Sequence, residues 1–416
     1  MITQSSDIKG QSRNTEVKAD LKQCHQINGR VGSVIIGGHF QGLGVLRSLA
    51  RQGVPIYLLD QGLCIGRFSR YHKRFAKCPH VKQEALFLEF LIDLAKKEKL
   101  DGWLIYPNDD DTVCFLAKHK EELEEYYRVT TPSWDVARLA YDKRLTYELA
   151  ERCGIPIPRT SYPRDVADLE HLDIDFPAII KPSIKEPFYS RTRKKAIRVD
   201  DRRALLDEYA KAAPMIESMQ TLMVQELIPG GARVLFSVGS VCRKGELTAR
   251  IVARRPRQHP MDFGHATTYA ETVDIPELEE MSRKLLSAMN YDGLSEVEFM
   301  LDPRDGKYKM IEVNARPWGW HTLAISAGVD LPYLSYLNRL DQAVKHNGFA
   351  VGVKWVRLTT DIPTVVGELL KGRMKLGDYL SSLRGRKADA VLSFRDPLPF
   401  VAEVMMLPYL WIKRGF

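Results

Sequence analysis

A predicted β-hairpin near residues 295–316 carries charged side chains on one face. Residues 295–301 and 307–313 are strand-like, and Asp305-Gly306 between them is a strong signal for a tight turn. Successive side chains of a strand point to opposite faces, so Glu312, Asn314 and Arg316 share one side, opposite an apolar side. An acid, an amide and a guanidinium cannot offset their desolvation by apolar packing. This face is therefore expected to bind ions or water.

The parity of the first strand allows Glu298 to face Glu312 across the hairpin. Two carboxylates and the amide oxygen of Asn314 would then converge. Hard oxygen ligands of this kind suit Mg²⁺, which binds through few carboxylates plus substrate phosphates. Arg316 could hold a phosphoryl group through two hydrogen bonds. The pattern favours a phosphoryl-transfer site, and the alternative is a surface hairpin with solvated charges.

The composition is that of an ordinary globular protein. The chain has 416 residues, enough for two or three domains, and a formal net charge of +8. This positive excess favours anionic partners, namely nucleotide phosphates, a membrane surface or nucleic acid. The six cysteines are widely spaced and form no C-x-x-C pair, which favours a reducing cytoplasm over a disulfide framework or a zinc site. Residues 1–30 have no apolar segment like that of a signal peptide and are predicted to be disordered.

Residues 31–130 are predicted to form a small α/β domain. The strand GSVIIGG, a helix closing on Gly53 and a second strand ending at Asp60 open a doubly wound sheet. The glycines at 37, 38, 42 and 44 do not fit G-x-G-x-x-G, so a dinucleotide site is weakly indicated. An amphipathic helix is expected near residues 85–99, with an apolar stripe formed by Leu86, Phe87, Phe90, Leu91 and Leu94. Residues 109–111 are predicted to cap the next helix, and the alternative is contact with an amine substrate.

Two lysines and one strand end suggest a nucleotide site. Lys181 ends the apolar strand FPAIIK, where an ammonium group must reach solvent or meet an anion. Lys143 begins a helix after Asp142 and could equally be solvated. Residues 225–228 close a strand before Pro-Gly-Gly and can offer backbone groups to an adenine edge. Each of these features alone is more often structural than functional.

Together and in this order, the segments resemble the ATP-grasp superfamily over about residues 31–335. The matching segments are the Gly-rich first turn, DK…GIPIP, FPAIIKP, VQELIPGG, GLSEVEFMLDPRDGKYKMIEVNARPWGW and SAGVDLP. Within the superfamily the chain is most similar to the bacterial carboxylate–amine ligases. The resemblance implies an α/β pre-grasp domain (31–130) and two α+β ATP-grasp lobes (131–335). Residues 336–416 are expected to form a C-terminal helical extension.

The resemblance also implies a role for each site residue. Lys143 and Lys181 would contact the phosphates of ATP, with Lys181 also near the adenine. The adenine would meet the strand end formed by Gln225, Glu226, Leu227 and Ile228.

The implied metal site holds two Mg²⁺ ions, with Mn²⁺ as an alternative. Glu298 would hold one ion, Glu312 would bridge both, and Asn314 would hold the second. Arg316 would stabilise the phosphoryl group during transfer, and Arg316 and Lys181 are the implied catalytic residues.

Two stretches depart from the family pattern. Residues 182–198 stand where the family has a Gly/Ser-rich loop over the phosphates, but they contain no glycine and many cations. This loop is expected to close by charge instead of by backbone amides. Arg233 stands near the place where an acid often binds the ribose, which puts the ribose contacts in doubt.

Three regions are candidates for binding the acid and amine substrates. Residues 254–265 are predicted to form a polar loop that is either a carboxylate clamp or simply solvated, and its charged members are Arg254, Arg255, Arg257 and His259. Trp318 and Trp320 either line a pocket or cap the core, with core favoured, and His321 is expected to be structural. The resemblance places the Gly-rich first turn near the acceptor substrate.

The expected activity is that of an ATP-dependent ligase. A carboxylate would be phosphorylated to an acyl phosphate, an amine would attack it, and an amide, ADP and phosphate would result. The alternatives are a non-catalytic ATP-binding regulatory module and a small-molecule kinase of the same fold. The expected partners are a small carboxylate and a small amine, with no nucleic acid, and homodimers are common in the superfamily.

The C-terminal stretch 400–416 is apolar with a basic end. Pro408 is expected to interrupt any helix, and no apolar run reaches the ~18 residues of a membrane span. Packing on a lobe or on a dimer partner is the favoured interpretation. The alternative is a peripheral membrane anchor with Trp411 at the headgroup level and Lys413-Arg414 on anionic lipid.

Overall fold

The computed structural model describes residues 26–27, 29–216, 221–264, 266–342, 346 and 348–414. Most of the segment predicted to be disordered (1–25 and 28) lies outside these residues. The remainder of that segment pairs as a short antiparallel hairpin of β1 (Gln26–Ile27) and β2 (Arg30–Val31). Within the described residues, no helix is both long enough and apolar enough to cross a membrane.

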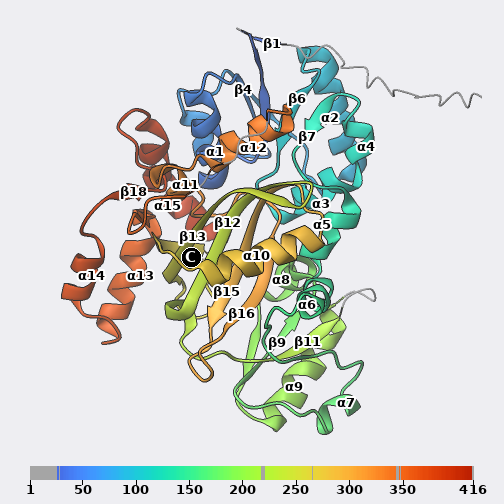
Figure 1. The fold of residues 1–416 in the computed structure, drawn as a ribbon, viewed down its shortest axis with the longest axis vertical. Coiled ribbons are helices and arrows are strands. Elements are labelled where there is room, and N and C mark those ends of the chain that lie inside the picture. The colour runs from blue at the N-terminus through green and yellow to red at the C-terminus, as the bar shows by residue number, and fades with distance from the viewer. Residues whose placement is uncertain are drawn as a thin grey trace, which may run out of the picture.

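The N-terminal part is a five-stranded parallel sheet covered by helices, at the top of Figure 1. The strand order is β5-β4-β3-β6-β7, and the apolar central strands are buried, as parallel strands between two helical layers must be. The strands are β3 (Ser33–Ile36), β4 (Ile56–Asp60), β5 (Arg74–Lys77), β6 (Trp103–Tyr106) and β7 (Tyr127–Val129). The helical elements are α1 (Phe40–Arg51), η1 (Ile65–Phe68), α2 (Glu84–Glu98), α3 (Asp110–Lys118) and α4 (Lys120–Leu123).

Local signals set these helix ends. Gly53, with φ +80°, adopts the left-handed conformation that ends α1. The Asp109 side chain accepts a hydrogen bond from the Thr112 N–H, so the cap predicted there is confirmed. The predicted stripe of α2 is correct at Phe87, Leu91 and Leu94 but wrong at Leu86, which is 54% exposed.

A four-stranded antiparallel sheet follows, in the order β10-β9-β11-β8, at the bottom of Figure 1. Its strands are β8 (Thr160–Ser161), β9 (Ala178–Pro182), β10 (Ile197–Val199) and β11 (Leu222–Glu226). The helices α7 (Ala167–Glu170), α8 (Lys185–Thr192) and α9 (Arg202–Ala212) lie beside it, whereas α5 (Trp134–Tyr141) and α6 (Lys143–Arg152), which precede it in the chain, contact β16 of the next sheet (Tyr308–Asn314). Residues 182–198, expected to be a loop, therefore contain the helix α8 and the start of β10.

The largest sheet has seven strands in the order β16-β15-β12-β13-β14-β17-β18. Its strands are β12 (Leu235–Arg243), β13 (Glu246–His259), β14 (Ala266–Thr272), β15 (Gly293–Leu301), β16 (Tyr308–Asn314), β17 (Lys354–Val356) and β18 (Lys387–Asp389), with η3 (Gly231–Val234) before β12 and α10 (Pro276–Ala288) between β14 and β15. The predicted hairpin turns are confirmed, because Lys244 and Gly245 have φ of +49° and +77° and Gly306 has +71°. The polar loop predicted at 254–265 is wrong in its first half, since residues 254–259 continue β13.

The C-terminal part adds helices around one end of this sheet. They are α11 (Thr322–Ser326), α12 (Leu331–Arg339), α13 (Leu358–Leu370), α14 (Leu376–Ser382) and α15 (Leu398–Arg414). The predicted break at Pro408 is wrong, because α15 runs through it. Arg47 on α1 donates to the Asp396 carboxylate at 2.9 Å, so the segment that leads into α15 packs on this helix of the N-terminal part. This contact agrees with the favoured interpretation of a packed tail.

Gly239 on β12 allows close packing of the buried Trp318 ring. A Cβ atom at this position would overlap the indole, which is 1% exposed, so the ring would have to shift. Gly239→Ala is expected to destabilise the protein by about 1–3 kcal/mol through overpacking.

Gly367→Ala is the matched control, because Gly367 lies inside α13 with no atom within 4 Å of the added methyl. Alanine at a helix interior should stabilise by up to about 1 kcal/mol. Thermal and urea unfolding of both variants measure the effect. A Gly239→Ala protein as stable as the parent would contradict this packing.

Candidate active site

A cleft of about 1100 Å³ is lined by residues of the four-stranded and seven-stranded sheets and by residues of α1 and α3 from the N-terminal part. Its walls include the ends of β9 and β11 and the charged face of the β15–β16 hairpin. Ligand pockets of about 300–1,000 Å³ hold one drug-sized molecule. This cleft therefore has room for a nucleotide and part of a second substrate.

The β15–β16 hairpin has the register that the sequence predicted. Glu298 pairs with Glu312 and Glu296 pairs with Asn314 across the two strands. The Asn314 amide donates to Glu296 at 3.1 Å and to Glu298 at 3.0 Å. One acid, Glu296, was not singled out from the sequence, although its parity with Glu298 was visible.

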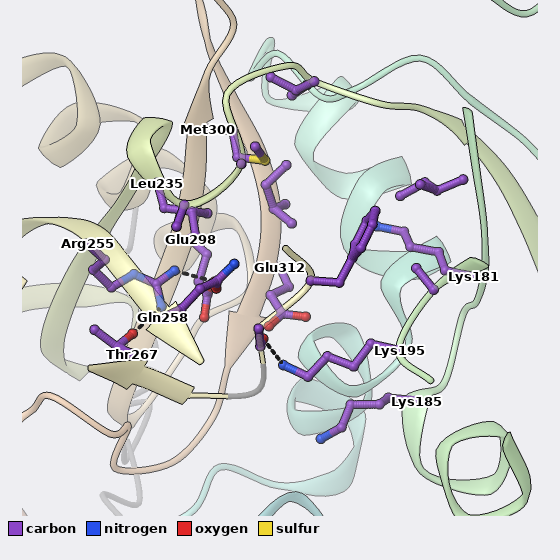
Figure 2. A pocket seen from close by; sticks show the side chains of 18 of the residues that line it. Lys181, Lys185, Lys195, Leu235, Arg255, Gln258, Thr267, Glu298, Met300 and Glu312 are labelled. Atoms are coloured by element: carbon purple, nitrogen blue, oxygen red, sulfur yellow. Dashed lines mark hydrogen bonds and ion pairs between the residues drawn. The ribbon is translucent and has the colours of Figure 1, made fainter. Parts of the chain in front are cut away.

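Arg255 is the buried cation that compensates these acids. Its guanidinium donates to Glu298, lies 3.7 Å from Glu296 and donates to Thr267 at 3.2 Å (Figure 2). Burial would lower the pKa of Arg255, but Glu298 and Glu296 raise it overall. Burial and the neighbouring Glu298 charge raise the pKa of Glu296 to about 8.

The other three candidate residues of the predicted polar loop also contact side chains of the protein. Arg257 is buried and holds Asp361 of α13 through two hydrogen bonds of 2.9 Å. Arg254 donates to Glu271 at 2.6 Å, and the ring of His259 lies 2.7 Å from the Thr364 hydroxyl. Neither interpretation of this segment, clamp or solvated loop, describes these contacts.

Four lysines lie on the opposite side of the cleft from the hairpin acids. Lys143 pairs with Glu312 at 3.1 Å, and the Lys181 ammonium donates to the Tyr147 hydroxyl at 2.7 Å. Figure 2 shows Lys181, Lys185 and Lys195 extending from one side while Glu298 and Glu312 approach from the other. Lys185 and Lys195 were noted only as part of a cation-rich stretch, and their places in the cleft were not predicted.

The charges of these lysines respond to burial. Burial and the nearby Lys143 lower the pKa of Lys181 to about 7, and burial lowers that of Lys195 to about 8. For Glu312, burial acts upward, but Lys143 and Lys195 lower the pKa overall. Glu312 is thus held ionised. Within the part of the chain that the structure describes, Lys181 and Lys195 have no acid close enough to compensate their burial, and this arrangement favours anionic ligands.

Arg316 contacts an acid at the start of α3 in the N-terminal part. Its guanidinium donates to Asp110 at 2.5 Å and to the Asn314 side-chain oxygen at 3.2 Å. Lys185 also reaches Asp110, at 3.3 Å. Asp110, predicted as a helix cap, instead joins the pre-grasp segment to the charged hairpin, whereas Asp111 lies 3.7 Å from Lys82.

The predicted adenine segment lies along the cleft, but its acid is already paired. Glu226 accepts from Lys309 at 2.9 Å and from Arg304 at 2.5 Å. Gln225 donates to Thr160 at 2.6 Å. The Leu227 N–H donates to the Pro177 carbonyl at 3.3 Å, while Ile228 is buried. A purine at this place would have to use the remaining backbone groups.

The aromatic residues after the hairpin are buried and also line the cleft. Trp318 and Trp320 are each 1% exposed, and Trp320 donates to Glu296 at 2.8 Å. His321 Nδ1 lies 2.7 Å from the Trp318 carbonyl, and burial lowers the pKa of His321 to about 4. The predicted core positions are therefore confirmed, and His321 is a neutral buried group. Arg233, the other residue in doubt, contacts the Arg373 carbonyl at 3.2 Å.

The oxygen donors of the hairpin fit a small hard cation. Among the described residues, no three His, Cys, Asp or Glu side chains form a cluster that could hold a metal ion by itself. The hairpin offers two carboxylates, from Glu298 and Glu312, and the amide oxygen of Asn314. Mg²⁺ usually takes few protein ligands and completes its shell with water and phosphate oxygens. This donor set agrees with that requirement, and a site made of protein ligands alone would be incomplete.

Residues 218–359 match the sequence model of a family described as "ATP-grasp in the biosynthetic pathway with Ter operon". The match covers β11 to β17, including the charged hairpin. The chain thus carries an ATP-grasp domain, and the resemblance predicted from the sequence is confirmed.

Among proteins of known function, the chain is similar to D-aspartate ligase from Enterococcus faecium (strain Aus0004). The two are 23% identical over 256 residues, which are 57% of this chain and 59% of that enzyme. The chain therefore matches less than two thirds of the length of this relative.

Solved structures share the fold at low identity. The L-amino acid ligase from Bacillus licheniformis has a TM-score of 0.57 and 18% identity, covering 74% of each chain. The biotin carboxylase domain of a Hydrogenobacter thermophilus 2-oxoglutarate carboxylase has a TM-score of 0.63 and 16% identity, covering 79% of this chain and 74% of that chain. That domain was solved as a dimer with MgADP, ADP and bicarbonate. The α/β and ATP-grasp fold class predicted from the sequence is confirmed.

The lowered pKa of Lys181 predicts a pH-dependent stability. A lysine whose pKa is about 7 in the folded protein binds fewer protons there than in the unfolded chain, up to its ordinary value of 10.5. Stability due to this group therefore rises with pH across that interval and is lowest below it. Lys181→Met should stabilise the protein most near about pH 6, by up to a few kcal/mol, and progressively less toward about pH 10.

Thermal unfolding across this pH range measures the effect. Tyr147 keeps a partner in the variant, because its hydroxyl also donates to the Ile311 carbonyl at 2.7 Å. Lys284→Met, on the exposed face of α10, is the control and should show a small change that does not vary in this way. An equal effect of Lys181→Met at both ends of the range would show that the ammonium is not penalised by burial.

Proposed function

We propose that this protein is an ATP-dependent ligase that joins a small carboxylate to a small amine through an acyl phosphate. One observation carries the proposal. Glu298 and Glu312 pair across the hairpin, and together with Asn314 they line the same cleft as a group of lysines. Similarity to D-aspartate ligase supports the reaction class. The identity of the acid and of the amine is not part of the proposal.

Lys143 and Lys181 would bind the phosphates of ATP, with Lys185 and Lys195 adding positive charge. All four side chains line the cleft. Lys181 and Lys195 are partly neutralised because burial lowers their pKa values. The negative phosphate oxygens would raise these pKa values, so both lysines should become protonated when ATP binds. Residues 225–228 would border the adenine.

Glu298, Glu312 and Asn314 would hold two divalent ions, Mg²⁺ or Mn²⁺. When bound, the ions would neutralise the phosphate oxygens and align them for transfer. Arg255 and Lys143 now compensate Glu298 and Glu312, and each would have to yield carboxylate oxygens to an ion. Lys143 also helps to lower the pKa of Glu312, so this carboxylate is ionised before metal binds.

Arg316 would hold the transferring phosphoryl group, in place of its present partner Asp110. A carboxylate oxygen of the acid attacks the γ-phosphorus, and the bond to the β–γ bridging oxygen breaks to release ADP. The amine nitrogen then attacks the acyl carbon, phosphate leaves with the bonding electrons, and the nitrogen loses a proton. An amide, ADP and phosphate result.

A second candidate is a regulatory module that binds ATP without turnover. The Arg255 contact to Glu298 favours it, because a guanidinium here opposes metal binding. A small-molecule kinase would share every step up to phosphoryl transfer. Product analysis separates these functions: an amide indicates the ligase, a phosphorylated acid indicates the kinase, and no ADP release indicates the module.

Release of ADP in a screen of acids and amines with Mg²⁺ and ATP tests the ligase. With an active pair, Glu312→Gln is expected to reduce turnover at least about 100-fold, the scale for removing one transition-state-stabilising group. Glu280→Gln, an exposed acid on α10, is the matched control and should keep full activity.

The unfolding temperature of Glu312→Gln must be measured alongside turnover, because Lys143 loses its partner in this variant. Wild-type ADP release by a folded Glu312→Gln protein would refute the assignment of this residue. Failure of every pair, with ATP-Mg²⁺ still raising the unfolding temperature, would favour the regulatory module.

A further inference from the structure

The last helix of the chain presents apolar side chains to solvent. On α15, Leu398, Val401, Met405 and Tyr409 follow one another at helical spacing and are 59%, 49%, 77% and 41% exposed. The opposite side buries Ala402, Glu403 and Met406. A helix that is apolar on both sides is expected between two apolar layers or against a membrane.

A second apolar stripe lies on α13. Ile362, Val366 and Leu370 are spaced four residues apart and are 51%, 48% and 84% exposed. Phe394, in the segment before α15, is 96% exposed. An exposed apolar set of this size is unusual for a surface without a partner.

The charged side chains around these stripes are almost all positive. Seven exposed cations occupy this part of the chain: Lys371, Arg373, Lys375, Arg384, Arg386, Lys387 and Arg395. Of the acids described in residues 351–409, four are buried and one is half-buried, which leaves Asp378 as the exposed one. The surface is cationic because most of the acids in this part of the chain are buried in the fold.

Buried contacts link these helices to one another and to β13. Arg357, directly before α13, donates to Glu403 of α15 at 2.6 Å. Arg257 donates to Asp361 of α13 and, at 2.9 Å, to Ser382 of α14. The labels of α13, α14 and α15 lie on the same side of the molecule in Figure 1. We call the exposed residues of 358–409 named above the C-terminal docking surface.

We propose that the C-terminal docking surface binds the surface of an anionic lipid bilayer. Aliphatic side chains would enter the interface while the surrounding lysines and arginines meet lipid phosphates. The exposed apolar residues are mostly aliphatic, whereas nucleic acid is bound by stacking on aromatic rings. A second copy of the chain would bring two cationic surfaces together. The proposal does not depend on the ligase assignment.

Docking would bring one rim of the cleft to the bilayer. Glu368 and Arg373, at the end of α13, line the cleft and pair at 2.7 Å. Leu370, the most exposed residue of the α13 stripe, lies between them in sequence.

Vesicle cosedimentation of the full chain tests the proposal, with phosphatidylcholine alone or with added phosphatidylglycerol. Binding is expected only with the anionic lipid and should weaken with salt. Leu370→Glu with Met405→Glu should reduce binding at least about 10-fold, and Arg384→Gln with Arg386→Gln should reduce it about 5-fold per charge. Leu86→Glu, at a leucine of α2 that is 54% exposed, is the control and should bind like the parent.

Sedimentation velocity and thermal unfolding of each variant complete the test. Folded variants with the expected order of affinities support the lipid surface. Binding no stronger to anionic than to neutral vesicles would overturn it, as would equal losses in the Leu86→Glu control. A concentration-dependent dimer that Leu370→Glu with Met405→Glu abolishes, without vesicle binding by the parent, would replace lipid by a second copy.

Discussion

The buried guanidinium of Arg255 is the group on which the charged hairpin depends. Glu296 and Glu298 lie on β15, between β16 and β12 of the seven-stranded sheet, where two uncompensated carboxylates would repel each other. Arg255 reaches them from β13, with β12 between. Removing one member of a buried set of charges typically costs about 3–5 kcal/mol, because the others are left uncompensated.

The small residues of β12 make this reach sterically feasible. Ser237 pairs with Glu298 on one side and with Ala253 on the other, and Gly239 pairs with Glu296. The space that a side chain would fill at Gly239 is occupied by Trp318, whose neighbour Trp320 donates to Glu296. The small residues Ser237 and Gly239 therefore allow both the contact of Arg255 with the two acids and the close packing of Trp318 on β12.

The lysines across the cleft are the counterpart of these acids. Lys181 and Lys195 lose part of their charge through burial, while Lys143 keeps its charge through Glu312. Such a site sacrifices stability, because buried ammonium groups gain little from a hydroxyl or a carbonyl partner. Groups that disfavour folding and face one cleft are typical of a site whose ligand supplies the missing charge.

The sequence predicted best those features that local rules decide. The register of Glu298 against Glu312 follows from a two-residue period and one Asp-Gly turn, and the structure has that register. Arg255 and Arg257 were misassigned to a loop because their partners, Glu298 and Asp361, lie 43 and 104 residues away. Asp110 could not be linked to Arg316, which is 206 residues further along. Polar residues inside a strand look like a loop until their distant partners are known.

The C-terminal helices follow the same logic of buried ion pairs. The family match ends at residue 359, but Asp361 and Glu403 compensate Arg257 and Arg357 inside the fold. Arg357 also lies 4.1 Å over the ring of Phe40, which lines the cleft. These inward contacts already fix α13 and α15 on the sheet. The apolar side chains on their outer faces remain 41–84% exposed and so add little to the stability of the folded chain. A partner outside the chain is therefore the better physical explanation for these outer faces.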